Sequence, residues 1–161
     1  MRIELKHLPY HGPNSKLYKK IEDDPYYALS PNSRKSKHWG ALSKAKEGAK
    51  DEIIAIIKQQ ERPSRPYNPA YITITWVVKD KKPRDIDNLV AAMKPYIDGI
   101  VAAGVIVDDS DKHVTYAPFN YEYGSEEKTI IQVDQADKPT PQGMFCPYCK
   151  CRLPNHWRND E

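Results

Sequence analysis

The chain has 161 residues, a net charge of +3 and three cysteines. This length suits one globular domain, which would bury roughly 70% of its unfolded surface. No apolar run approaches the ~20 residues that cross a bilayer, the first residues lack the apolar region of a signal peptide, and three cysteines do not make a disulfide framework. We therefore expect a soluble cytoplasmic protein without a membrane partner.

The amino-terminal segment predicts a short strand followed by a loop. Residues 2–8 alternate apolar and polar side chains up to Pro9, as a strand does. Residues 10–32 combine prolines, tyrosines and acidic residues without a clear period, which indicates a loop or arm. The tyrosines of this loop either pack over the edge of the core or stack on nucleic-acid bases. They are Tyr10, Tyr18, Tyr26 and Tyr27.

A long amphipathic helix is predicted over residues 38–60, with Ser36 near its amino-terminal cap. Six apolar residues share one helical face: Trp39, Leu42, Ala49, Ile53, Ile56 and Ile57. The segment leading into the helix and the first half of the helix are basic, through Arg34, Lys35, Lys37, Lys44, Lys46 and Lys50. These cations either contact DNA phosphates or form a solvated helix face.

The middle of the chain predicts further strands. Residues 61–69 hold three prolines and form a rigid linker, and residues 71–78 are β-branched and aromatic, as in a strand. A short strand is predicted at residues 105–107, and a hairpin at 113–123 and 128–133 around Gly124-Ser125. The expected fold is α+β, a small mixed sheet of about four strands packed with two main helices.

Two carboxylates stand one residue apart at Asp85 and Asp87. Alternate side chains of an extended backbone point the same way, so an Asp-x-Asp at a strand end directs both carboxylates into one space. A divalent cation relieves the repulsion between them. The same residues can instead cap the helix predicted to begin at Asn88.

A second acidic cluster, Asp108, Asp109 and Asp111, follows the apolar run at 105–107. If the helix between the clusters folds back, the carboxylates meet and form a site with open water positions of the kind that Mg²⁺ prefers. Taken alone, the second cluster is ordinary turn chemistry. The order and spacing of the two clusters therefore predict a magnesium site, with Mn²⁺ as a possible substitute.

The helix between the clusters carries a lysine opposite its apolar face. At about 100° per residue, the apolar face comprises Leu89, Met93, Tyr96, Ile97 and Ile100. Lys94 lies on the opposite face with Asp87 and Asp98, where it can neutralise charge on a phosphate or pair with Asp98 on a solvated face. Pro95 removes one helical donor, which predicts a kink or break near Ala91.

These residues resemble the RusA family of Holliday-junction resolvases, which are small metal-dependent endonucleases of phages and prophages. The resemblance covers roughly residues 30–133 and rests on Arg84-Asp85-Ile86-Asp87-Asn88-Leu89, Lys94, Asp98-Gly99, Ala103-Gly104 and Asp108-Asp109-Ser110. The segment before Lys94 is about one helical turn longer than in the best-known member. Lys94 therefore matches the family lysine when aligned backward from Asp98, whereas Ala91 takes that position when aligned forward from Asn88.

The resemblance implies that Asp85, Asp87, Asp109 and Lys94 are catalytic, that the three aspartates bind Mg²⁺, and that a homodimer makes paired nicks in a four-way DNA junction. Seven cations are assigned to DNA contact, the last three from the turn before Asp85: Arg34, Lys35, Lys37, Lys44, Lys81, Lys82 and Arg84. A lysine-rich turn can also be merely solvated. The nuclease domain is expected to span residues 1–133.

Residues 134–143 predict a linker, and residues 144–161 a cysteine-rich tail. Cys146 and Cys149 have the spacing that begins a zinc knuckle, and Cys151 and His156 can complete four ligands. The alternative is a flexible tail with reduced thiols. The leading prediction for the whole chain is thus a Mg²⁺-dependent Holliday-junction endonuclease. Two rivals remain: a non-enzymatic DNA-binding or adaptor protein with a zinc-knuckle tail, and a metal nuclease for other branched DNA.

Overall fold

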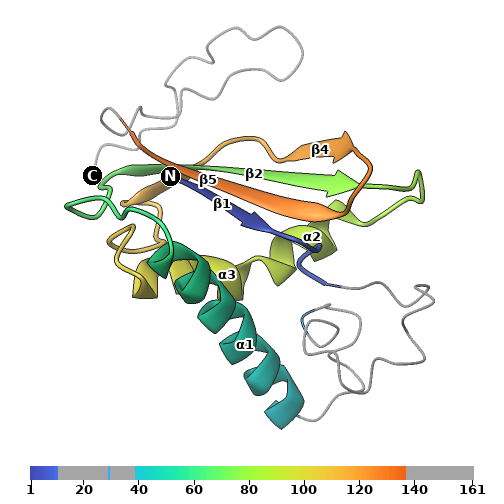
Figure 1. Cartoon of the computed structure of the whole chain (residues 1–161), viewed down its shortest axis with the longest axis horizontal. Helices are drawn as coiled ribbons and strands as arrows, with labels where there is room; N and C mark the ends of the chain where they lie inside the picture. Colours follow the sequence, from blue (N-terminus) through green and yellow to red (C-terminus); the bar gives the residue numbers. More distant parts are fainter. Residues whose placement is uncertain (11–28, 30–38, 137–161) are drawn as a thin grey trace, which may run out of the picture.

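The computed structural model describes residues 1–10, Leu29 and residues 39–136. Its elements in chain order are β1 (Arg2–Leu5), α1 (Trp39–Lys58), β2 (Ala70–Val78), α2 (Ile86–Ala92), α3 (Lys94–Ala102), β3 (Val114–Tyr116), β4 (Asn120–Tyr123) and β5 (Lys128–Gln135). One five-stranded mixed sheet carries all three helices on the same face (Figure 1). The predicted α+β class is confirmed.

Strand β2 is the centre of the sheet. It pairs antiparallel with β5 on one side and parallel with both β3 and β4 on the other, while β1 completes the order β1-β5-β2-β3. Ile72, Ile74 and Trp76 are fully or almost fully buried, whereas Tyr71 is exposed and Thr73 only partly buried. This alternation, which the sequence predicted for residues 71–78, directs one face of β2 toward the helices.

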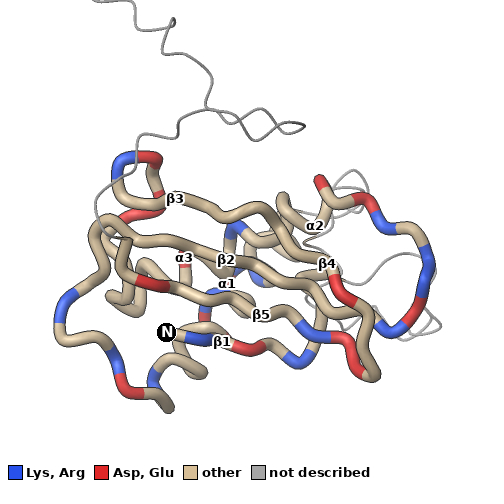
Figure 2. Tube along the Cα trace, turned by 90° about the horizontal axis from the view of Figure 1, so that it is seen from above, with Lys and Arg blue, Asp and Glu red and all other residues tan. Residues whose placement is uncertain are grey.

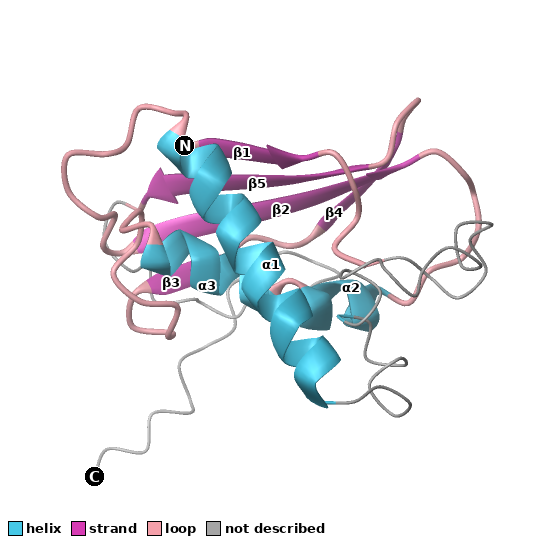
Figure 3. Cartoon of the chain, turned by 60° about the horizontal axis from the view of Figure 1, so that its bottom comes forward, coloured by secondary structure: helices cyan, strands magenta, loops and turns pink. Residues whose placement is uncertain are grey.

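Helices α1 and α3 pack in close contact on one face of the sheet, below it in Figure 1 and in front of it in Figure 3. A Cβ added at Gly99 of α3 would lie 2.9 Å from the Cβ of Ile53 and 2.9 Å from the Lys50 carbonyl oxygen, so only glycine permits this approach. Burial of Ile53 and Ile57 confirms the predicted apolar face of α1. Trp39 was wrongly included, because its side chain is 77% exposed.

The second predicted helix is two helices, α2 and α3, separated by Met93. The break lies two residues after the predicted position at Ala91, and Pro95 sits in the first turn of α3, where its missing N–H costs nothing. The predicted apolar face is buried across the break in all its members: Leu89, Met93, Tyr96, Ile97 and Ile100.

The strand predicted at residues 105–107 is wrong. This segment forms a single parallel bridge between Tyr67 and Ile106, and Val105 accepts a 2.8 Å hydrogen bond from the Tyr67 amide. Val105 and Ile106 are apolar because they are buried in the core beyond α3. Gly104, with φ 75°, provides the reversal that brings them there.

The predicted hairpin is also wrong. Residues 113–123 form two short strands, β3 and β4, and β4 and β5 flank opposite sides of β2, so they do not pair with each other. The connection passes close over the end of β2, where Gly124 donates a 2.9 Å hydrogen bond to the Val78 carbonyl oxygen. An ideal Cβ at Gly124 would lie 2.5 Å from Val77 Cγ1, so a larger residue at this crossing would force the Val77 side chain to shift.

The boundaries of the domain differ slightly from the prediction. Strand β5 extends to Gln135, two residues into the predicted linker at 134–143, and pairs with β2 along eight residues. Among the residues described, no helix has the length and apolar character needed to cross a membrane. The cysteine-rich tail lies outside the described residues, as do Arg34, Lys35 and Lys37.

Candidate active site

Asp85 and Asp87 lie at the start of α2 rather than at the end of a strand. Strand β2 ends at Val78, a charged loop follows (Figure 2), and helix α2 begins at Ile86, two residues before the predicted start. Asp85 is the N-cap residue and Asp87 belongs to the first turn. Both carboxylates are exposed, and the helix dipole stabilises negative charge at this end.

Two polar side chains, those of Asn88 and Tyr10, interact with Asp85. Asn88 donates a 3.0 Å hydrogen bond from Nδ2 to an Asp85 carboxylate oxygen. Tyr10, from the segment after β1, is half-buried against the core, which favours packing for this tyrosine over base stacking. Burial raises the pKa of Tyr10, and the negative charges of Asp85 and Asp87 raise it further. We name Tyr10, Asp85, Asp87 and Asn88 the Asp85 cluster.

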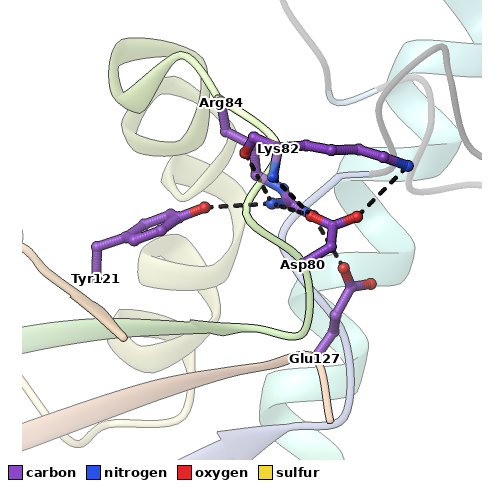
Figure 4. A network of polar contacts seen from close by, with 5 residues as sticks. All are labelled: Asp80, Lys82, Arg84, Tyr121 and Glu127. Atoms are coloured by element: carbon purple, nitrogen blue, oxygen red, sulfur yellow. Dashed lines mark hydrogen bonds and ion pairs between the residues drawn. The ribbon is translucent and has the colours of Figure 1, made fainter. Parts of the chain in front are cut away.

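Arg84 is the centre of a network of polar contacts (Figure 4). Its guanidinium lies 2.8 Å from Asp80 and 3.0 Å from Glu127, and it donates a 3.2 Å hydrogen bond to the Tyr121 hydroxyl. Burial disfavours the charged form, but the bonds to Tyr121 and Asp80 outweigh that effect and raise the pKa of Arg84. The Arg84 side chain is only 18% exposed. Its bonds to Tyr121 and Glu127 connect the β2–α2 loop to β4 and to the β4–β5 turn.

The other described cations assigned to DNA contact are on the surface. Lys81 and Lys82 are exposed in the β2–α2 loop, and Lys82 lies 3.5 Å from Asp80. Lys44 is exposed on α1. The structure leaves Lys44, Lys81 and Lys82 accessible to a ligand, whereas it commits Arg84 to partners of its own.

Lys94 is the first residue of α3 and bridges two carboxylates. Its Nζ lies 2.5 Å from an Asp98 oxygen and 2.5 Å from an Asp109 oxygen. Hydrogen bonds to Asp109 and then to Asp98 raise the pKa of Lys94, so it remains charged throughout the physiological range. Lys94 therefore makes the ordinary i,i+4 pair and also contacts the predicted catalytic aspartate.

Hydrogen bonds stabilise the turn after Ile106, which carries Asp109. The Ser110 hydroxyl donates a 2.7 Å hydrogen bond to Asp108, which lowers the pKa of that carboxyl, and the Ser110 carbonyl accepts the amides of His113 and Val114. Tyr116 of β3 lies nearby: burial raises the pKa of its hydroxyl, and the Asp109 charge raises it further. We name Lys94, Asp98, Asp109 and Tyr116 the Lys94 cluster.

An open groove of about 470 Å³ lies between α1 and α3 beside Asp109. From α1 it is lined by Ser43, Lys46, Glu47 and Lys50, and from the α3 side by Pro95, Asp98, Val101, Ala102, Asp108 and Asp109. The α1 residues follow the spacing i, i+3, i+4, i+7 of one helical stripe. The sequence left DNA contact and a solvated face open for Lys46 and Lys50, and neither was among the seven cations assigned to DNA contact.

The two clusters are separate. Tyr116 pairs with Ile72 of β2, whereas Tyr121, which bonds Arg84, pairs with Trp76. These register points are four residues apart, or about 13 Å along the strand. Carboxylate oxygens are ligands that Mg²⁺ prefers. Within residues 1–10, 29 and 39–136, however, no three His, Cys, Asp or Glu side chains are grouped to hold a metal ion. The three-aspartate magnesium site stays a prediction.

The chain was also compared with known proteins. No family model matches it, and no curated protein matches it.

Proposed function

We propose that the protein is a divalent-metal-dependent endonuclease for branched DNA, with the four-way junction as its substrate, as the resemblance to the RusA family implies. One observation carries the proposal. The lysine and the aspartate that the resemblance assigns to catalysis, Lys94 and Asp109, are in contact although they come from different elements. The open groove beside Asp109 supports it, because a nucleic-acid strand needs a solvent-accessible path past the reacting group.

In this proposal Asp85, Asp87 and Asp109 hold Mg²⁺, or Mn²⁺ in its place. When bound, such an ion would supply an activated water and would offset negative charge on the leaving 3′ oxygen. Lys94 holds the Asp109 carboxylate in place and offsets charge on the phosphate. Because the two clusters are separate, the proposal requires α2 and the 104–111 turn to approach each other when the ion and the substrate bind.

The remaining parts of the proposal follow from the substrate. A four-way junction has two-fold symmetry, so two symmetric nicks suit a homodimer whose copies each present one site. DNA junctions arise in the cytoplasm of a bacterium or a phage-infected cell, which is where we propose that the protein acts. Zinc binding by Cys146, Cys149, Cys151 and His156 remains a separate prediction about the tail.

A cleavage assay tests the proposal. The wild type should nick a labelled four-way junction in Mg²⁺ but not in EDTA, and should leave linear duplex intact; a flap substrate distinguishes a different branched-DNA nuclease. Asp85→Asn and Asp109→Asn should abolish cleavage yet retain junction binding. Asp51→Asn is the matched control, since it removes an exposed α1 carboxylate outside both clusters. Cleavage by all three variants at the wild-type rate would refute the assignment.

One observation favours the non-enzymatic rival. Lys94 already forms ion pairs with both Asp98 and Asp109, as a lysine with a purely structural role on the surface would. In a DNA-binding or adaptor protein these residues would only shape a turn. Titration with Mn²⁺, followed by the loss of its free electron-spin resonance signal, separates the two functions. Binding that Asp85→Asn or Asp109→Asn weakens supports the nuclease, and no binding supports the rival.

A further inference from the structure

We infer that the groove between α1 and α3 is a binding channel for the DNA sugar-phosphate backbone. In this channel Lys46 and Lys50 bind the phosphates that neighbour the reacting phosphate at Asp109. This inference rests on the proposed function and deepens it, because it assigns a phosphate subsite to residues outside both clusters. It starts from the position of the groove, which has the Asp109 carboxylate in one wall and the two lysines in the other.

The geometry of α1 selects these two lysines. Lys46 and Lys50 are one helical turn apart, so both project from the stripe that lines the groove. Lys44 stands about 200° around the helix from Lys46 and does not line the groove. Close packing at Gly99, where α3 meets the backbone of Lys50, fixes the distance between the two walls.

The lysines at the groove differ in whether they have ion-pair partners. Among the described residues Lys46 and Lys50 form no ion pair, whereas Lys94, which contacts the groove-lining Asp98 and Asp109, is paired with both. Unpaired ammonium groups beside an open groove are available to an anionic ligand. A chain of phosphates fits an open groove better than a small molecule does, because small-molecule sites bury most of the ligand surface.

The charges at the groove predict that DNA binding depends on a divalent cation. Counting Lys94 with the groove lining, three lysines face four carboxylates: Glu47, Asp98, Asp108 and Asp109. This balance is net negative, so the lysines alone bind phosphate weakly. A divalent cation on the acidic wall makes the groove net positive. The lysines should therefore contribute most to DNA affinity when such a cation is present.

Equilibrium binding of a fluorescent four-way junction tests the inference, in Ca²⁺ and in EDTA, at about 50 and 200 mM salt. Each phosphate contact adds about one to the slope of log affinity against log salt. Over this range the wild type should therefore lose roughly tenfold more affinity in Ca²⁺ than Lys46→Ala/Lys50→Ala. Lys46→Arg/Lys50→Arg should retain the wild-type slope. Lys58→Ala is the control, because it removes an exposed lysine of α1 outside the groove.

Three results would overturn the inference: a wild-type slope in the double alanine variant, an equal loss in the Lys58→Ala variant, or no junction binding by the wild type. Failure of the proposed function gives a different result. A wild type that binds in this lysine-dependent way but cuts no branched substrate keeps the phosphate channel and removes the nuclease. Circular dichroism of the variants confirms that the fold is unchanged.

Discussion

The Lys94 ammonium lies 2.5 Å from the Asp109 carboxylate, although the two are fifteen positions apart in the chain. Between them the chain completes α3, reverses at Gly104 and returns through the buried Val105 and Ile106. Lys94 is 62% exposed and Asp109 24% exposed, so the ion pair contributes at most about 1 kcal/mol to stability. Its larger consequence is orientation, because it holds one carboxylate against one amine at the groove.

Lys94→Met should separate catalysis from stability. If Lys94 offsets charge on the reacting phosphate, its loss lowers junction cleavage by roughly 100-fold or more, while the free energy of unfolding changes by less than about 1 kcal/mol. Single-turnover cleavage and urea denaturation measure the two effects. Lys112→Met, at an exposed position in the turn after Asp111, is the control. Wild-type cleavage by Lys94→Met would leave Lys94 as a surface residue only.

Gly99→Ala should destabilise the protein. The added methyl group would lie 2.9 Å from Ile53 and from the Lys50 backbone, so α1 and α3 must separate, at a cost of roughly 1–3 kcal/mol. Gly48→Ala is the matched control in α1, because a Cβ there meets nothing within 4 Å and alanine favours the helix by about 1 kcal/mol. Thermal denaturation should show Tm shifts of opposite sign. A Tm for Gly99→Ala at or above the wild-type value would contradict this packing.

Arg84→Met should also destabilise the fold, by about 1–3 kcal/mol, because it leaves the partly buried Glu127 and Tyr121 without their partner. Lys81→Met removes an exposed cation from the same loop and should change the free energy of unfolding by less than about 0.5 kcal/mol. Urea denaturation of both variants measures the difference. Equal stabilities would mean that the Arg84 network adds nothing to the fold and would restore Arg84 as a candidate DNA contact.

Tyr10 predicts a loss of stability at high pH. Burial and the charge of Asp85 raise its folded-state pKa above the ordinary value of 10.0. The neutral phenol is therefore favoured in the folded protein, and this contribution is complete below pH 10 and is lost as the pH rises through the folded-state pKa. Urea midpoints between about pH 8 and 11 should fall less steeply for Tyr10→Phe than for the wild type. Parallel curves would show that the pKa of Tyr10 is the same in the folded and the unfolded protein.

Much of the local structure was predictable from periodicity. The buried face of Leu89, Tyr96 and Ile100 follows from the 3.6-residue period, and it continues across the break at Met93, since the residues on both sides of the break are buried in the core. The alternation of residues 71–78 likewise identified β2. Such patterns are local, since each depends only on which side of an element is buried.

The strand order was not predictable in this way. β4 and β5 are joined by a short turn around Gly124, which resembles a hairpin connection, yet they lie on opposite sides of β2. Pairing of β5 with β2 along eight residues decides between the two arrangements, and those partners are distant in the chain. The alternation of buried and exposed residues along a strand is the same whichever strand lies beside it, so it does not identify the partner.

The sequence by itself identified candidate residues by type and spacing: Asp85, Asp87, Lys94 and Asp109 for catalysis, and Lys46 and Lys50 as part of a basic helix surface. Only the tertiary structure decided which of them meet. It brought Lys94 to Asp109, enclosed Arg84 among its own partners and set Lys46 and Lys50 across a groove from Asp109. The physical reason is that helix packing at Gly99 and the reversal at Gly104 set distances between elements, which no pattern within one element encodes.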